Sequence, residues 1–293
     1  MTKSLRIKRA ELISKCQFVF KCPYCDVAME VTTDLKSIVC SNNHSFDFAK
    51  QGYVNLLRCS PKANYGKELF EARRTMIAES DLFHPLHEFI RDIIKGAIEQ
   101  LQRDVSILDV GCGEGSHLHK TIHGTKNSGV SHGFGLDISK EAIKMASRYY
   151  ENHIWLVGDL ANPPFHDQTF NIILNILSPS NYKAIKKILV KEGLAVKVVP
   201  RTNYLKELRE FFAESEEHDY KNNETVSLFK EHFHSVKTFP LSYKKSLHPS
   251  EIQSLVQMTP LAWTFDQEKI GKFMSKESVN ITVDLDILIG KNI

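Results

Sequence analysis

The sequence predicts an α/β fold, a parallel sheet with helices on both faces, preceded by a small metal-binding module. Three observations lead to this prediction. From residue 105 onward, strand-like and helix-like segments alternate, a pattern typical of parallel strands joined by crossover helices. A glycine-rich turn follows the first of these strands. Nearer the N-terminus, three cysteines and a histidine have the spacing of metal ligands.

The size and charge of the chain limit the number of domains and the kinds of partner it can have. Its 293 residues are enough for one large domain and a small one. The formal net charge of +3 permits an anionic partner without requiring one. The N-terminus has no apolar signal core, and no apolar run approaches the roughly 20 residues of a membrane helix. We therefore expect a cytoplasmic protein without membrane contact, whose six cysteines are reduced.

The first residues of the chain are strongly basic. Residues 1–21 carry six lysines and arginines against one acid, Glu11. We expect a basic N-terminal arm over this segment. Two interpretations stay open: a solvated tail, or an arm whose cations lie on a polyanion.

Residues 22–57 predict a zinc-binding module. Cys22 and Cys25 form a C-x2-C pair, and Cys40 and His44 form a C-x3-H pair after 14 intervening residues. Three thiolates and one imidazole complete a tetrahedron with no open position, which describes a structural zinc site. A redox C-x-x-C pair is the alternative, but it leaves the second pair unexplained and lacks a βαβ setting.

Residues 58–104 predict a linker and helices that lead into the main domain. Pro61 and Gly66 lie in a polar stretch, which indicates a loop. Apolar residues then recur at helical spacing over residues 68–80 and 84–103.

The main domain is expected over residues 105–293. Apolar and β-branched runs predict its strands, and apolar residues at helical spacing predict its helices. The expected strands are 105–110, 132–138, 154–159, 170–177, 193–200, 236–243 and 279–290. The expected helices are 139–150, 182–192 and 249–258.

The glycine-rich turn predicts a nucleotide-like ligand. Gly111, Gly113 and Gly115 directly follow the first strand, and their small size lets a ligand approach the backbone. Asp137 ends the next strand, where a carboxylate can accept both ribose hydroxyls. The third glycine of the dinucleotide fingerprint has no match here. The spacing resembles motif I of the class I, Rossmann-like S-adenosylmethionine methyltransferases; an ordinary tight turn is the alternative.

That resemblance suggests roles for two further segments. Asp159 ends the third strand, where class I methyltransferases typically place an acid on the adenine amino group; a helix N-cap is the alternative. Residues 175–182 follow the fourth strand, where this class usually places the groups that face the methyl acceptor. We expect the acceptor there.

Six stretches together carry a closer resemblance. They are CPYC at 22–25, the eighteen residues from Cys40 to Leu57, EARR at 71–74, DVGCGEG at 109–115, LDISKEAIK at 136–144 and QMTPLAW at 257–263. They closely resemble the RlmA-type 23S rRNA (guanine-N1) methyltransferases, and the match runs from about Cys22 to the C-terminus. The zinc module joined to motif I is the most specific part of this pattern.

The resemblance implies methyl transfer from S-adenosylmethionine to N1 of a guanine in a 23S rRNA hairpin. It implies the same four zinc ligands and puts the donor against Gly113 and Glu114. Phe83 and Tyr204 align with aromatic or imidazole groups near the donor, although their residue types differ from the family's. It further implies a homodimer whose clefts hold the RNA.

Two other functions stay open at this point. A methyltransferase for a small molecule would explain the sheet and Asp137 but gives the zinc module no task. A non-catalytic RNA-binding protein would not need an intact glycine turn. The sequence identifies no residue as the base that removes the N1 proton of guanine.

Overall fold

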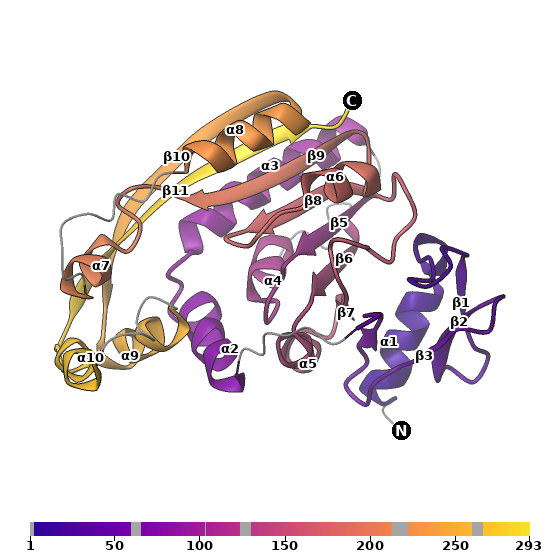
Figure 1. Ribbon diagram of the computed structural model, residues 1–293, viewed down its shortest axis with the longest axis horizontal. Coiled ribbons are helices and arrows are strands. Elements are labelled where there is room, and N and C mark those ends of the chain that lie inside the picture. Colours follow the sequence, from indigo (N-terminus) through magenta and orange to yellow (C-terminus); the bar gives the residue numbers. More distant parts are fainter. Residues whose placement is uncertain (1–2, 60–65, 103, 124–129, 213–221, 260–265) are drawn as a thin grey trace.

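The computed structural model describes residues 3–59, 66–102, 104–123, 130–212, 222–259 and 266–293. Its main sheet contains β4 (Val54–Asn55), β5 (Val105–Val110), β6 (Val130–Asp137), β7 (Ile154–Val157), β8 (Phe170–Ile176), β9 (Leu189–Pro200), β10 (His234–Leu247) and β11 (Val279–Lys291). Their order across the sheet is β10-β11-β9-β8-β5-β6-β7-β4 (Figure 1). All neighbours pair in parallel except β11, which is antiparallel to both β9 and β10.

Helices cover both faces of this sheet, as the sequence predicts. One apolar layer includes side chains of α3 (His84–Leu101), α4 (Ser116–Ile122), α5 (Lys140–Tyr149), α7 (Lys206–Phe212), α9 (Pro249–Met258) and α10 (Gln267–Met274). The other includes side chains of α1 (Leu5–Ser14), α6 (Tyr182–Ile188) and α8 (Asn223–His232). Two short helices, α2 (Lys67–Arg74) and the π-helix Thr75–Glu79, precede α3. None of the helices described is long and apolar enough to cross a bilayer.

The alternation of side chains along the strands explains this two-layer core. In β8, Ile172 and Leu174 belong to the α3 layer, whereas Ile173 belongs to the α6 layer. Successive strand residues point to opposite faces, so a strand that is apolar throughout must be covered on both. The apolar run 172–174 of β8 therefore places this strand in the interior of the sheet, covered on both faces.

The chain reverses direction across the sheet at β5. It first adds β6 and β7 on one side of β5, and then returns to add β8 and β9 on the other. Ligands of open α/β sheets bind in the crevice at the carboxyl ends of the strands where the order reverses. The glycine-rich turn after β5 and the segment after β8 both lie at this edge.

Several segments differ from the sequence prediction. The helix expected over 182–192 ends at Ile188, because Leu189 is buried and begins β9 by pairing with Phe170. The two C-terminal strands are longer than expected, and β11 runs antiparallel. Helices α7, α8 and α10 lie where no helix was expected. Pro61 of the expected linker and Pro260 to Trp263 of the QMTPLAW stretch lie outside the described residues.

The N-terminal segment is a helix. Ser4 caps α1 by accepting a hydrogen bond from the Ile7 N–H, and Ala10 and Ile13 are fully buried. Arg9 is also buried, and its guanidinium donates to the Tyr150 carbonyl. The solvated tail is therefore wrong for this part of the chain. The other interpretation, that its cations lie on a polyanion, stays open.

The small module joins the main domain through a continuous core. It holds a three-stranded antiparallel sheet, β1 (Met29–Val31), β2 (Ser37–Cys40) and β3 (Ser45–Asp47). Figure 1 shows it beside the β7 edge of the main sheet. Phe20 packs against Phe134 and Phe165, with ring centroids 6.2 and 5.8 Å apart. Strand β4 follows the three-stranded sheet and pairs with β7. The two regions therefore share both a strand pairing and an apolar core.

Candidate active site and metal centre

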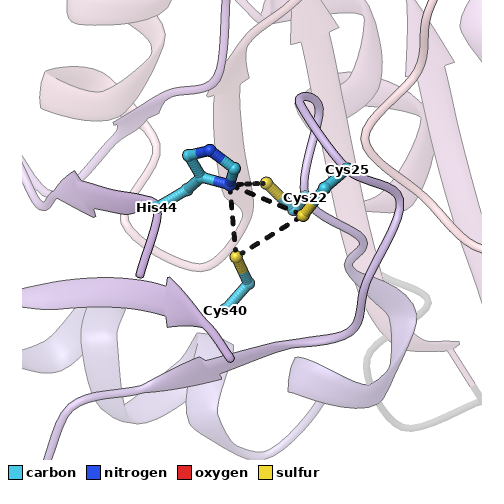
Figure 2. Close-up of side chains that lie close together, drawn as sticks. All are labelled: Cys22, Cys25, Cys40 and His44. Atoms are coloured by element: carbon cyan, nitrogen blue, oxygen red, sulfur yellow. Dashed lines mark hydrogen bonds between the residues drawn. The ribbon is translucent and has the colours of Figure 1, made fainter. Parts of the chain in front are cut away.

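Four predicted ligands converge at the edge of the small module. The sulfurs of Cys22, Cys25 and Cys40 lie 3.4, 3.5 and 3.5 Å from Nδ1 of His44. The sulfurs of Cys25 and Cys40 are 3.7 Å apart. Figure 2 shows the imidazole nitrogen and the three sulfurs facing one central point. Among the described residues, these four are the group of three or more ligand-type side chains close enough to share one metal ion.

The spacing of these atoms fits a zinc ion. Tetrahedral zinc with ordinary bond lengths separates two sulfurs by roughly 3.8 Å and a sulfur from a nitrogen by roughly 3.5 Å. The observed separations match both values. No disulfide links these cysteines, since all of them are free thiols. The hydrogen bond from the Val27 N–H lowers the pKa of Cys25 to about 6, which favours the metal-binding thiolate.

Two tight turns present the ligands. In the first, the Cys22 N–H donates to the Val27 carbonyl and the Asp26 N–H donates to the Cys22 carbonyl. In the second, the Cys40 N–H donates to the His44 carbonyl. Each turn needs one residue with positive φ, and Asp26 (59°) and Asn43 (61°) supply it. Asp and Asn tolerate this backbone conformation better than most residues.

The glycine-rich turn is fixed by Asp137. The Gly113 N–H donates to Oδ2 of Asp137 (2.8 Å), and the Ser139 N–H donates to Oδ1 (2.8 Å). A carboxylate accepts about four hydrogen bonds, so both oxygens keep capacity for a ligand's hydroxyls. The structure thus brings Gly113 and Asp137 together, as the sequence predicts for a donor site.

The two glycines in the predicted donor site have different surroundings. Both have positive φ, 68° at Gly111 and 58° at Gly113. A Cβ at Gly111 would lie 2.6 Å from Oγ of Ser178, so this glycine makes room for the segment after β8. A Cβ at Gly113 would meet only the guanidinium of Arg73, at 3.6 Å. Gly113 is therefore the position where a ligand can approach the backbone, and contact between Gly111 and the donor stays a prediction.

An acidic cluster lies under the turn. Glu114 is buried, and its Oε2 accepts a hydrogen bond from Nε of Arg73 (3.1 Å). Asp109 is 1% exposed, and neither of its oxygens has a hydrogen-bond partner within the described part of the chain; the same holds for Oε1 of Glu114. Burial raises the pKa of Asp109 well above its ordinary value, and the charges of Asp137 and Glu114 raise it further. Buried carboxyl groups of this kind are suited to a cationic ligand.

A cavity of about 600 Å³ adjoins this turn at the carboxyl ends of β8 and β9. Phe83 and Tyr204, which the sequence placed near the donor only by resemblance, both line it together with Arg73. Phe83 is buried and packs edge-on against His117, with centroids 5.2 Å apart. The cavity thus gathers residues from several separate parts of the chain.

Asp159 lies on an exposed turn after β7. Its Oδ1 accepts the Ala161 N–H (2.8 Å), and no helix begins there. The helix N-cap interpretation is therefore wrong. A role in binding adenine stays a prediction.

The segment after β8 is tied to the end of β5. The Asn175 amide nitrogen donates to the Val110 carbonyl (3.0 Å) and to Oγ of Ser178 (2.6 Å). Ser178 in turn donates to the same carbonyl. Ser178, Pro179, Ser180 and Tyr182 line the cavity. This segment, where we expected the methyl acceptor, is thus held next to the glycine-rich turn.

Sequence reasoning missed two residues of the site. Arg73 stands in the EARR stretch, but nothing in the sequence shows that it reaches Glu114, 41 positions away. Lys197 is the single lysine in the apolar second half of strand β9, residues 193–200, and is 4% exposed. Burial lowers its pKa to about 8. A lone cation in a buried strand was the available signal.

Comparison with known proteins finds matches for both the zinc-binding module and the main domain. The family model for the N-terminal region of RlmA, a zinc ribbon, matches residues 20–63, and a methyltransferase domain model matches residues 107–192. A Bacillus subtilis protein named "Putative 23S rRNA (guanine-N(1)-)-methyltransferase YxjB" is 40% identical over 93% of this chain and 96% of its own length. The chain belongs to this family. Membership of the RlmA-type methyltransferases thus explains why the chain has both a zinc ribbon and a methyltransferase domain.

Two other relatives are more distant. A Streptomyces fradiae 23S rRNA (guanine(748)-N(1))-methyltransferase is 28% identical over 86% of this RlmA-type chain and 88% of its own. A Mycobacterium tuberculosis phthiotriol/phenolphthiotriol dimycocerosates methyltransferase is 28% identical, but over only 29% of this chain and 31% of its own. The rRNA methyltransferase matches most of the chain, whereas the other matches less than a third of it.

Proposed function

We propose that this protein transfers the methyl group of S-adenosylmethionine to N1 of a guanine in a hairpin of 23S rRNA. The observation that carries the proposal is the 40% identity, along nearly the whole chain, with the Bacillus subtilis protein named "Putative 23S rRNA (guanine-N(1)-)-methyltransferase YxjB". The zinc ribbon and the methyltransferase domain both match their family models.

The donor site follows from the residues at the carboxyl edge of the sheet. When bound, S-adenosylmethionine supplies an electrophilic methyl group on a cationic sulfur. Asp137 accepts the ribose hydroxyls, Gly113 lets the ligand reach the backbone, and Glu114 and Asp109 offer carboxyl oxygens without a hydrogen-bond partner among the described residues. Asp159, Phe83, Tyr204 and Gly111 complete the proposed contacts. Positioning of this kind supplies much of the rate of an in-line displacement.

The zinc ribbon is proposed to bind one structural zinc ion through Cys22, Cys25, Cys40 and His44. Its closed donor set leaves no position for a reacting water, so its task is to hold the module folded and to help recognise the RNA. We assign residues 22–57 to this module, 58–104 to the connection and 105–293 to the methyltransferase domain.

The assembly belongs to the same proposal. We propose that two copies pair and hold the hairpin between their clefts, in the cytoplasm, where ribosomes are made. Light scattering of the purified protein at several concentrations tests this pairing. A mass of one chain at all of them contradicts it.

Methylation of a small molecule is the competing function. The phthiotriol/phenolphthiotriol dimycocerosates methyltransferase supports it for part of the chain only, because that match covers 29% of this chain. A test separates the two: the purified protein receives radiolabelled S-adenosylmethionine with either an unmodified 23S rRNA hairpin or a metabolite extract. We expect label in the RNA, recovered as N1-methylguanosine by mass spectrometry. Label only in the extract contradicts the proposal.

A further inference from the structure

Lys197 is the buried cation whose surroundings need an explanation. It lies near the carboxyl end of β9, opposite Asn175 in β8, and lines the cavity beside the glycine-rich turn. Its Nζ donates to Oδ1 of Asn175 (2.5 Å) and to the Ser178 carbonyl (2.5 Å). Both acceptors are neutral oxygens, and none of the ion pairs described includes Lys197. A buried ammonium without a carboxylate partner is costly.

The orientation of Asn175 is set by its other contacts. Its amide nitrogen is surrounded by oxygens of Val110, Ser178 and Pro179, at 2.6 to 3.1 Å. The Ser180 hydroxyl donates to Oδ1 (2.6 Å). The amide nitrogen must therefore point away from Lys197, and the amide oxygen must point toward it. The site is thus built to accept hydrogen bonds from Nζ.

This arrangement matches a neutral amine. A neutral lysine has two N–H groups and one lone pair, and two acceptors bind two N–H groups. The lone pair is then left for a group in the cavity. An ammonium would keep a third N–H instead. Burial lowers the pKa of Lys197 to about 8, so a sizeable fraction is neutral near physiological pH.

We propose that Lys197 is the catalytic base that removes the N1 proton of the target guanine, with Asn175 as its positioning residue. The inference rests on the proposed function and deepens it. The N1–H bond breaks as the proton moves to Nζ. The electron pair left on N1 forms the new N–C bond, the methyl carbon's bond to sulfur breaks, and its electron pair stays on sulfur. The resulting ammonium of Lys197 returns its proton to solvent.

Other titratable groups around the cavity fit this role less well. Arg73 from α2, His117 from α4, Tyr182 from α6, Tyr204 before α7 and Glu224 from α8 also line it. Arg73 stays protonated, and burial raises the pKa of Tyr182. His117 is a weak base, because burial lowers its pKa well below the ordinary value, with the neighbouring charges of His87 and Arg73 adding to this. Lys197 combines burial, a lone pair and a place beside the expected acceptor segment.

The test compares three variants with the wild type. Lys197→Met keeps the length of the side chain without a base. Lys197→Arg keeps a cation that cannot lose its proton. Lys191→Met is the matched control, since Lys191 is exposed at the other end of β9. Single-turnover methylation of the 23S rRNA hairpin is measured from about pH 6 to about pH 9.5, donor affinity by calorimetry, and the lysine titration by ¹³C NMR.

The base role predicts a specific set of results. The wild-type rate rises about tenfold per pH unit and levels off near pH 8. Both Lys197 variants lose on the order of a hundredfold or more in rate and lack this inflection, while donor affinity stays within about twofold. The control keeps the wild-type profile. In NMR, the signal absent from Lys197→Met titrates near pH 8 in the wild type.

Two outcomes overturn the proposal and separate it from the proposed function. If the wild type methylates the hairpin and Lys197→Arg matches its rate, or if the Lys197 signal titrates above about pH 10, the base role is wrong and the rRNA function stands. If the wild type leaves N1 of the hairpin guanine unmethylated, the proposed function is wrong, and the base role with it.

Discussion

The zinc ribbon and the catalytic sheet are stabilised in different ways. The ribbon has three strands of three or four residues and depends on four ligand atoms that meet at one point. The catalytic sheet has eight strands between two apolar layers. A region of this small size cannot bury enough apolar surface on its own, whereas the larger one can. The difference shows that removing one ligand atom should affect the ribbon far more than removing one contact affects the sheet.

The largest effect is expected from loss of the metal. Cys25→Ser removes one of the four ligands, and metal binding in such modules contributes on the order of 10 kcal/mol to folding. We expect no bound zinc by elemental analysis and loss of the ribbon's structure by NMR. Cys59→Ser is the control, because Cys59 is exposed and outside the ligand cluster; it should keep one zinc per chain. Full zinc occupancy in Cys25→Ser would show that the ligand assignment is wrong.

The shared core predicts the next effect. Phe20→Ala removes the ring that packs on Phe165 and Phe134, and such a change typically costs about 3–5 kcal/mol. Phe18→Ala is the matched control, since this side chain is 75% exposed; it should change the free energy of unfolding by less than about 0.5 kcal/mol. Urea unfolding measures both. Equal, small effects would mean that the ribbon and the sheet are independent.

Donor binding is expected to change less. Asp137→Ala removes the ribose acceptor and the anchor of the Gly113 N–H. Hydrogen bonds to a charged group are worth roughly 1.5–3 kcal/mol, so donor affinity should fall about tenfold or more. Calorimetry provides the measurement, with Asp167→Ala as an exposed control. The donor-site assignment fails if Asp137→Ala binds as tightly as the control.

The smallest effect is expected from the N-terminal cations. Lys3 pairs with Glu11 (2.5 Å) and Lys8 with Glu151 (3.0 Å), so neither charge is fully available to phosphates. We expect Lys3→Ser combined with Lys8→Ser to change RNA affinity by less than about threefold and to leave its salt dependence nearly unchanged. A drop in the salt slope of one unit or more, measured by filter binding, would instead support the polyanion-binding arm.

Local patterns made parts of the structure predictable from the sequence. The zinc ligands follow from spacing alone, because two short turns fix where Cys22 and Cys40 point. The glycine-rich turn and Asp137 follow from strand ends that lie at the same edge of the sheet. The two-layer architecture follows from alternating segments. In each case the residues that interact are close in sequence, or their positions are fixed by the order of the strands.

Contacts between distant residues could not be predicted. The helix over Leu5–Ser14 was missed because three basic residues are interspersed among its apolar ones, and its burial depends on packing at the β7 edge. The helix predicted over 182–192 is longer than the observed one. Leu189 fits both the helical and the strand pattern, and only its pairing with β8 places it in a strand. The proposed role of Lys197 depends on its hydrogen bonds to Asn175 and Ser178, which lie 22 and 19 positions away in the sequence.

The pairing of β4 with β7 has a consequence for the fate of the chain when zinc is scarce. Without β4, the unpaired N–H and C=O groups of β7 would form an open sheet edge beside the apolar side chains Phe134 and Phe165. Such an edge is a template for strand addition by another molecule. Zinc starvation is therefore expected to drive self-association of newly made chains, so that metal supply controls how much of this protein stays available as well as how it folds.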